Sequence, residues 1–264
     1  MQESNIYCTT DTKSIRLELK QLVNQNVTVF LDEFSEVLLI RGKRKNASED
    51  YLEYRDKLWL QHAIDYGERL WNGNLLSAES IKIDNNVVSV NVSECEYKDV
   101  MFKHWAKPED IIEHYQRGNL PIHIFSSVLP TLPTGEALLA QVGCGTIQNS
   151  GTLDMIGGSL NIDETQITSQ ECIITHTLKE LTEETGIVVD ESHIKLTSIN
   201  LSGGALFFLY TCPLPNSNCL SHFTANTEVE KIIVHNLRDP IVGYDVTNEL
   251  NLAMQTLNYK RHPE

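Results

Sequence analysis

Two short stretches decide the fold of this chain: Gly157-Gly158 and, after a spacer, Lys179-Glu180-Leu181-Thr182-Glu183-Glu184-Thr185-Gly186-Ile187. The second stretch predicts the last turns of a helix, because Gly186 is typical of the residue just past a helix C-terminus. Apolar residues at helical spacing predict the buried stripe of that helix. They are Ile174, Leu178 and Leu181. We therefore expect a helix over about 169–185.

Three acids of this helix, Glu180, Glu183 and Glu184, fall within an arc of about 100°. Glu180 is three residues from Glu183 and four from Glu184, the spacings at which helical side chains meet. Like charges at these spacings destabilise a helix, and acids near its C-terminus also oppose the helix dipole. A hard cation such as Mg²⁺, which binds oxygen ligands, would reverse that cost. The alternative is an ordinary solvated face, because glutamate-rich helices are common.

The stretch resembles the Nudix box, Gly-x5-Glu-x7-Arg-Glu-U-x-Glu-Glu-x-Gly-U, where U is an aliphatic residue. The C-terminal half of the box matches at each defined position except one, where Lys179 replaces arginine. Lysine is a point charge, whereas the family arginine orients a glutamate through a fork of donors. A second departure is Ile156, which stands where the family has proline before Gly157.

The middle of the box carries an insertion of seven residues. Gly158-x5-Glu164 keeps the first spacing of the motif, whereas Glu171-x7-Lys179 keeps the second. Thr168 and Glu171 also fit a capping box at the start of the helix. We therefore favour Glu164 as a loop residue and Glu171 as part of the cap, and assign a metal to neither.

The resemblance implies hydrolysis of a nucleoside diphosphate linked to another moiety, with Mg²⁺ or Mn²⁺ as cofactor. It implies metal ligation by Glu180, Glu183 and Glu184. Glu180, Glu183 and Lys179 are the expected catalytic residues. The expected substrate-binding residues are Gly157, Gly158, Glu228 and Glu230. Paired glycines let backbone pass close to such a site, and a later loop of the family often supplies a further acid. Glu228 and Glu230 could equally be solvated loop charges.

The substrate is suggested by a weaker resemblance ahead of the box. Leu58-Trp59, residues 70–76 and Glu96-Tyr97-Lys98-Asp99 are similar to the region before the Nudix domain in eukaryotic UDP-glucose diphosphatases. That similarity implies cleavage of a UDP-sugar into UMP and a sugar 1-phosphate. ADP-ribose or a dinucleotide is the alternative substrate. A Nudix-like module that binds a nucleotide without turnover is the alternative of a different class.

The order of elements predicts an α/β fold. We expect a Nudix-type α/β/α sandwich with a mixed sheet over 118–264, preceded by a smaller α+β domain over 1–117. In the N-terminal part we expect a hairpin or two sheet strands over 15–40, a helix over 48–71, a hairpin over 80–92 and a helix over 107–118. In the C-terminal part we expect strands at 122–129, 137–142, 194–201, 205–211 and 231–234, and a closing helix over 246–257. The segment 97–105 is ambiguous.

Composition limits the class of partner. The 264 residues carry a formal charge of -15, which argues against a general nucleic-acid binder. A phosphate compound can still bind if a metal ion bridges the two like charges. The six cysteines form no metal-binding pattern and are expected to be reduced core thiols. We find no apolar run typical of a signal peptide or a membrane span and expect a cytoplasmic protein that binds a small molecule, with its oligomeric state open.

Overall fold

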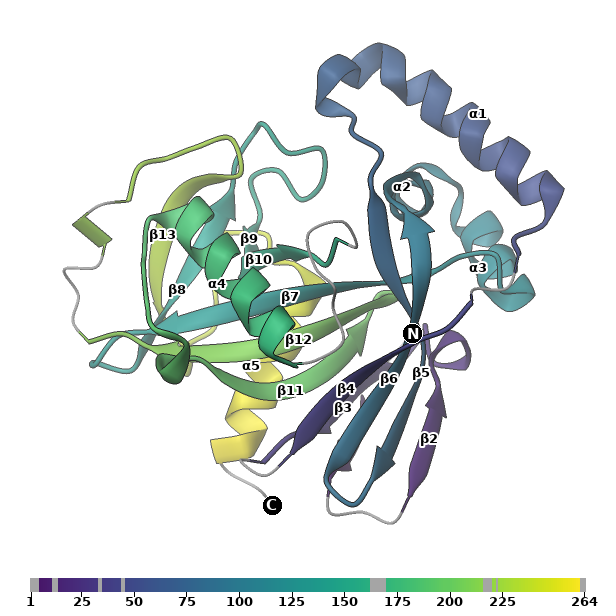
Figure 1. Cartoon of the computed structure of the whole chain (residues 1–264). Helices are drawn as coiled ribbons and strands as arrows, with labels where there is room; N and C mark the ends of the chain where they lie inside the picture. The colour runs from purple at the N-terminus through teal and green to yellow at the C-terminus, as the bar shows by residue number, and fades with distance from the viewer. Residues whose placement is uncertain are drawn as a thin grey trace.

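The computed structural model describes residues 5–10, 14–32, 35–43, 46–161, 170–215, 220–221 and 223–261, in a mixed α/β arrangement (Figure 1). The helices are α1 (Glu49–Tyr66), α2 (Tyr97–Trp105), α3 (Pro108–Arg117), α4 (Gln170–Thr185) and α5 (Asn248–Arg261). Short 3-10 turns lie at η1 (Leu19–Gln21), η2 (Gly67–Arg69) and η3 (Glu191–His193). Within these residues no helix combines the length and the apolar character that a membrane crossing needs.

The strands form one twisted sheet with parallel and antiparallel neighbours. They are β1 (Asn5–Thr9), β2 (Ile15–Glu18), β3 (Asn26–Phe30), β4 (Glu36–Arg41), β5 (Asn74–Asp84), β6 (Val87–Glu96), β7 (Ile122–Thr131), β8 (Glu136–Val142), β9 (Leu153–Asp154), β10 (Ile156–Ser159), β11 (Lys195–Ser202), β12 (Ala205–Pro213) and β13 (Val229–Asn236). The main path runs β1-β3-β11-β12-β7-β5-β6-β4. The predicted mixed sheet and α/β class are confirmed.

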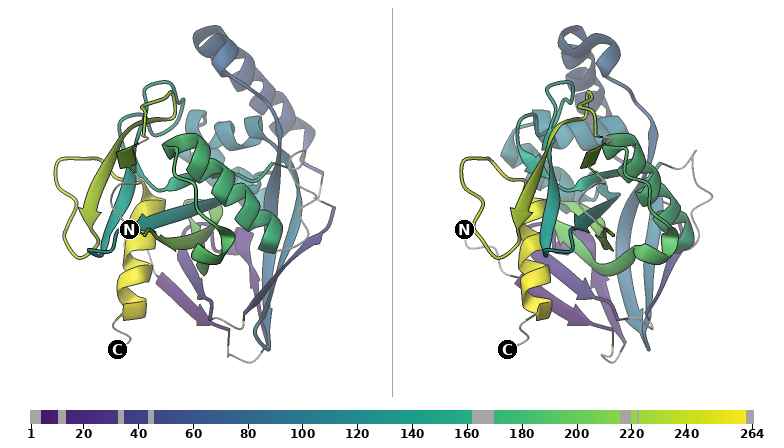
Figure 2. Two further views of the ribbon diagram at one scale, coloured as in Figure 1. Left: turned by 60° about the vertical axis from the view of Figure 1, so that its left-hand side comes forward. Right: turned by 90° about the vertical axis from the view of Figure 1, so that its left-hand side faces the viewer.

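The two faces of β12 belong to two different cores. Leu206, Phe208 and Tyr210 pack in one apolar cluster, which also holds Leu181 of α4. Phe207 and Leu209 alternate with them and pack in a second cluster, which holds four α5 residues. Such alternation places helices on both faces of a sheet. Figure 2 shows α4 and α5 on opposite sides of these strands, which is the predicted α/β/α sandwich.

Hydrogen-bonded strands cross the predicted boundary at residues 117 and 118. β5 pairs with β7 through Ser77 opposite His123 and Ala78 opposite Ile122. β3 pairs with β11, where the Thr28 hydroxyl donates to the side-chain oxygen of Asn200 at 3.0 Å. The boundary itself lies in the turn between α3 and β7. The division into two domains remains a prediction, and backbone pairs join its two parts.

The early strands are separate sheet strands and not the hairpin that was one reading of residues 15–40. β2 pairs with β5, β3 with β1 and β11, and β4 with β6. The hairpin predicted over 80–92 is confirmed and is longer, because β5 and β6 remain paired as far as Asn74 opposite Glu96. Of the cysteines expected in the core, Cys8, Cys95 and Cys212 are buried, whereas Cys144 is exposed.

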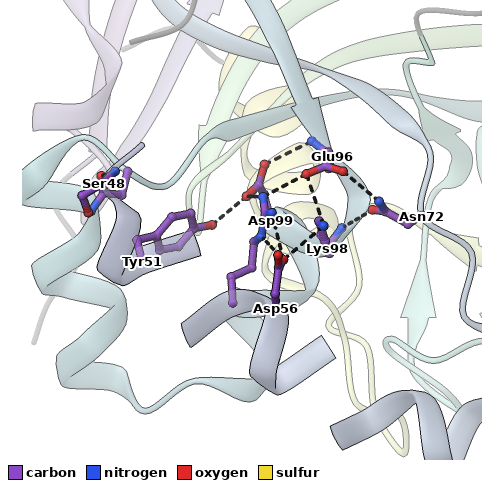
Figure 3. Close-up of polar contacts among 9 residues, drawn as sticks. Ser48, Tyr51, Asp56, Asn72, Glu96, Lys98 and Asp99 are labelled. Carbon is purple, nitrogen blue, oxygen red and sulfur yellow. Dashed lines mark hydrogen bonds and ion pairs between the residues drawn. The ribbon is translucent and has the colours of Figure 1, made fainter. Parts of the chain in front are cut away.

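The ambiguous segment 97–105 is helix α2, and buried charges fix it to α1 (Figure 3). Arg55 of α1 donates from Nη1 to Asp99 Oδ1 at 2.8 Å, and the Tyr51 hydroxyl donates to the same oxygen at 2.8 Å. The side chains of Arg55 and Asp99 are only 7% and 2% exposed. Asp99 also accepts from the backbone N–H of Glu96, which begins the helix with a capping box. The position of α2 therefore depends on a desolvated ion pair.

Replacing Arg55 by methionine should lower the free energy of unfolding by about 3–5 kcal/mol, because Asp99 would keep its charge without the guanidinium. Urea unfolding followed by circular dichroism measures the change. Arg16→Met is the matched control, since Arg16 pairs with Glu18 at a side-chain exposure of 63%, and it should cost less than about 1 kcal/mol. A loss below about 1 kcal/mol for Arg55→Met would contradict the assigned importance of the pair.

Candidate functional site

The glycine pair and the acidic helix meet at β10. A Cβ on Gly158 would lie 2.6 Å from the carboxyl carbon of Glu180, so the backbone of β10 lies directly against that carboxylate. Gly157 has φ +153°, and a Cβ there would overlap the carbonyl oxygen of Ser126 on β7. Gly157 is therefore required sterically, whereas a side chain at Gly158 would displace the Glu180 carboxylate. The Glu180 carboxylate also lies 3.5 Å from Nε2 of His176, one turn earlier on α4.

The three predicted acids of α4 differ in depth. Glu184 is 7% exposed, and the Glu180 side chain is 18% exposed. Glu183 is 58% exposed, and its carboxylate lies 4.0 Å from the Lys179 ammonium. An arc of about 100° spans a helix from its buried side to its solvent side, and Glu183 lies at the solvent end. The structure brings Glu180 and Glu184 to one cavity and leaves Glu183 and Lys179 outside it.

Glu228 joins the two buried-side acids from the segment just before β13. It lines, with Glu180 and Glu184, a cavity of about 360 Å³ behind β10. Burial is the main cause that raises the pKa of Glu184 well above its ordinary value, and the charges of Glu180 and Glu228 raise it further. The backbone N–H of Gly157 donates to this carboxylate and partly opposes the rise. Glu230 is exposed and lies outside this cavity.

Asn226 connects the acidic helix to the loop that carries Glu228. Its side-chain N–H donates to the carbonyl oxygen of Glu184 at 3.2 Å, at the open C-terminal end of α4. Its side-chain oxygen accepts from the backbone N–H groups of Glu228 at 2.9 Å and Val229 at 2.8 Å. One amide therefore satisfies backbone groups on both sides and fixes the distance between them. Sequence reasoning missed this residue.

Asp154 is a fourth acid of the site, and sequence reasoning missed it as well. It lines the same cavity and accepts a hydrogen bond from the Thr247 hydroxyl at 2.8 Å. Burial raises its pKa to about 7, and the nearby charge of Glu249 contributes to the rise. The sequence held one indication of this role. Asp154 lies three residues before Gly157, so it comes close to the acidic helix once β9 and β10 form.

A second cavity, of about 520 Å³, adjoins the first and shares Asp154, Gly157 and Gly158 with it. Lys103 of α2 lines this cavity and donates to the carbonyl oxygen of Gly204 at 3.1 Å. Its ammonium also lies 3.2 Å from Nδ1 of His123. Burial lowers the pKa of Lys103 to about 8. No sequence signal marked Lys103 or His123, because strand pairing across the predicted domain boundary brings them here.

The donors fit a hard divalent cation by type. Carboxylate oxygens are the ligands that Mg²⁺ and Mn²⁺ prefer, and the cavity holds four of these groups. No three His, Cys, Asp or Glu side chains are grouped closely enough to hold a metal ion as they stand, over the part of the chain that the structure describes. Mg²⁺ keeps several waters and needs only one or two carboxylates, so the set remains compatible in type with such a cation.

The loop half of the motif lies partly outside the described residues. This is the case for Glu164 and Thr168, so the predicted loop position and the predicted N-cap stay predictions. Glu171 is exposed in the first turn of α4. The predicted helix over 169–185 is confirmed from Gln170 to Thr185, and Gly186 follows it with φ +74°.

Comparisons with known proteins find resemblance in structure alone. No protein-family model matches the sequence, and no curated protein matches it. Similar solved structures include a MutT protein from Methanosarcina mazei Go1, with 16% identity, 53% of this chain and 95% of that chain covered, and a TM-score of 0.39. The NUDIX domain of Shewanella oneidensis NrtR, solved with ADP ribose, has 11% identity, coverages of 53% and 88%, and a TM-score of 0.39. RenU, a Nudix hydrolase from M. Smegmatis, has 12% identity, coverages of 54% and 87%, and a TM-score of 0.38.

These structures bear the name of the family whose motif the chain resembles. Neither the UDP-glucose diphosphatase branch nor a two-domain arrangement follows from them. At such identities and scores, the chemistry has to be inferred from the residues of the chain itself.

Glu184→Gln should stabilise the protein at pH 8 in the absence of divalent metal. Because the pKa of Glu184 is raised on folding, its ionised form costs stability above the unfolded pKa, and that cost grows as pH rises. We expect the Tm of Glu184→Gln to exceed that of the wild type by roughly 2–4 °C for each kcal/mol of cost removed. The difference should shrink as pH falls toward the pKa of an ordinary glutamate, about 4.3.

The matched control for this prediction is Glu183→Gln, one residue away and mostly exposed. It should leave Tm within about 1 °C at either pH. Differential scanning calorimetry in EDTA measures both variants. A lower Tm for Glu184→Gln at pH 8 would mean that the hydrogen bond from Gly157 outweighs burial and repulsion.

Proposed function

We propose that this chain is a metal-dependent hydrolase of a nucleoside diphosphate linked to another moiety. One observation carries the proposal: Glu180, Glu184 and Glu228 converge on one cavity whose opposite wall, Gly157-Gly158, has no side chains. The charges of Glu180 and Glu228 raise the pKa of the buried Glu184 carboxyl, so gathering these acids costs stability. A bound cation would neutralise the charges of the cluster. Such a cation can also bridge an acidic protein to a diphosphate.

The residues of the cavity have different roles in the proposed reaction. Glu180, Glu184 and Glu228 would hold Mg²⁺ or Mn²⁺, which when bound neutralises the diphosphate and polarises its phosphorus for attack by water. The glycine pair presents backbone without side chains to the cavity that these carboxylates line. Asn226 holds the Glu228 loop against α4. One carboxylate of the set accepts the proton of the attacking water, which requires it to lie within hydrogen-bond reach of that water.

The motif predicts that Glu183 and Lys179 are catalytic, but neither residue lines the cavity. Their mutual contact at 4.0 Å lies on the solvent side of α4. Rotation of the Glu183 side chain could bring it to the mouth of the cavity when a cation draws the acids together. The loss of activity in a Glu183 variant would distinguish two possible ligand sets. In one set all three ligands are glutamates of α4, and in the other Glu228 takes the place of Glu183.

For the substrate we propose a UDP-sugar, cleaved to UMP and a sugar 1-phosphate. Support comes from the resemblance in residues 58–99 and from the paired cavities of about 360 and 520 Å³, which together suit a two-part ligand. The net charge of -15 is compatible with a small phosphate compound reached through a cation. ADP-ribose and dinucleotides belong in the same test, because each carries a diphosphate between two larger groups.

Purified protein should release a nucleoside monophosphate from at least one member of a panel of UDP-sugars, ADP-ribose and dinucleotides, with Mg²⁺ or Mn²⁺ at alkaline pH. Glu180→Gln and Glu184→Gln should each lower kcat/KM by about a hundredfold or more, a loss of about 2.7 kcal/mol in transition-state stabilisation. Glu230→Gln, which alters an exposed acid two residues from Glu228, is the control and should stay near wild type. Coupled phosphate release with product identification measures the rates.

Each remaining outcome has a defined meaning. If Glu183→Gln loses as much activity as Glu184→Gln, Glu183 turns into the cavity in the working enzyme. If no panel member is cleaved with either metal, the hydrolase proposal is wrong and a nucleotide-binding module without turnover replaces it.

A further inference from the structure

The second cavity lies on the far side of the glycine pair from the α4 glutamates. It shares the backbone of Gly157, Gly158 and Ser159 with the acidic cavity, together with Asp154 and Asn149. A ligand whose diphosphate sits at the glutamates would therefore extend one of its ends directly into this space. The lining comes from both halves of the chain, because α2 supplies Lys103 and the start of α5 supplies Asn248 and Glu249.

We propose that this cavity binds a glycosyl group, and that Lys103 is the residue that gives preference for it. The proposal deepens the hydrolase function above by naming which part of the substrate the N-terminal region recognises. It concerns binding, so it can be tested whether or not the protein turns substrate over.

The mixture of donors and acceptors in the lining favours hydroxyl groups as ligands. Lys103 and Asn248 offer N–H donors, whereas Glu249 and Asp154, which already accepts from Thr247 and Asn149, offer carboxylate oxygens. A sugar hydroxyl can donate and accept at the same time, so it can satisfy both kinds of neighbour. A further phosphate would lie close to the carboxyl groups of Asp154 and Glu249, and repulsion between the like charges would weaken its binding. The lining is therefore better matched to a polyol than to a second anion.

An aromatic stack supplies the apolar part of the lining. Phe125 lines the cavity and is stacked on Phe207, with ring centroids 5.2 Å apart. His123 stacks on Phe125, with centroids 5.6 Å apart. A ring held in this way loses little conformational entropy when a ligand covers it. The C–H groups of a sugar ring are the apolar surface that can contact it, while its hydroxyls reach the polar groups around.

Lys103 is held in position but keeps capacity for a ligand. Of its three N–H donors, one goes to the carbonyl oxygen of Gly204 and a second can reach Nδ1 of His123. The turn at Gly203-Gly204 admits no larger residue at 204, where a Cβ would overlap the Tyr115 hydroxyl. On the other side, Asp99 anchors the same helix one turn earlier through Arg55. These contacts fix the ammonium against the cavity and leave a third donor for the glycosyl group.

Two small ligands distinguish recognition of a sugar from recognition of a phosphate. Glucose 1-phosphate and methyl phosphate carry the same anion but differ in the glycosyl group. Each is titrated into the wild-type protein with Mg²⁺ present, and the Kd is measured by ligand-observed NMR. The wild type should bind glucose 1-phosphate more tightly. Lys103→Met should weaken glucose 1-phosphate about tenfold or more, the loss of a charge-assisted hydrogen bond, and change methyl phosphate less than about twofold.

The control is Lys107→Met, which removes the same charge four residues later from an exposed side chain outside the cavity. It should leave both Kd values unchanged. Melting temperature checks that Lys103→Met is folded. If it is not, Lys103→Gln replaces it, because glutamine keeps an N–H donor without the charge, and its Kd for glucose 1-phosphate should fall between the wild-type and methionine values.

Three results would overturn the inference: equal binding of the two ligands by the wild type, equal weakening of both by Lys103→Met, or no effect of that substitution. Equal weakening would mean that Lys103 binds the anion and not the sugar. Failure of the hydrolase proposal is recognised separately. In that case the wild type cleaves no panel member, yet still binds glucose 1-phosphate through Lys103.

Discussion

The site depends on one constraint, the burial of the Glu184 carboxylate among other acids and against a stretch of backbone without side chains. Glu184 is buried among Glu180, Glu228 and Asp154, and the chain tolerates this because surrounding elements are fixed by other means. The repulsion between its acids disfavours this position of α4. The helix is held there by hydrogen bonds from the Gly157 and Asn226 amides and by its apolar residues. Stability given up here is offset by packing on both faces of β12, where the two cores meet the sheet.

The depth of each glutamate follows from the same constraint. The wall of β10 approaches α4 so closely that a Cβ on Gly158 would displace the Glu180 carboxylate. A side chain on the buried side of the helix must then enter the cavity, and one on the solvent side stays out. Neighbouring residues of one motif thus acquire different chemistry, since the pKa of Glu184 rises while the Glu183 carboxylate remains in water.

The sequence predicted those features that depend on residues close together in the chain. The end of α4 at Thr185 was predictable because a glycine follows and apolar residues recur at helical spacing, and the hairpin around Asn85-Asn86 was predictable from its turn residues. Asp154, Lys103 and His123 were not, because pairing of β7 with β5 and of β9 with β8 brings them together from distant places in the chain. A helical wheel gave the arc of the glutamates, but only the position of β10 decides which end of the arc is buried.

The pairing of β3 with β11 has a consequence for how the protein is made. Thr28 and Asn200, which share a hydrogen bond, are 172 residues apart in the chain. At about 5–20 residues per second, a ribosome needs on the order of ten seconds or more to supply the partner of β3. Throughout that interval β3 can pair with β1 but not with β11, so Val27 and Val29, both buried in the finished protein, lack one side of their sheet. A polypeptide truncated before β11 would leave one edge of β3 unpaired, and an unpaired strand edge is prone to aggregation.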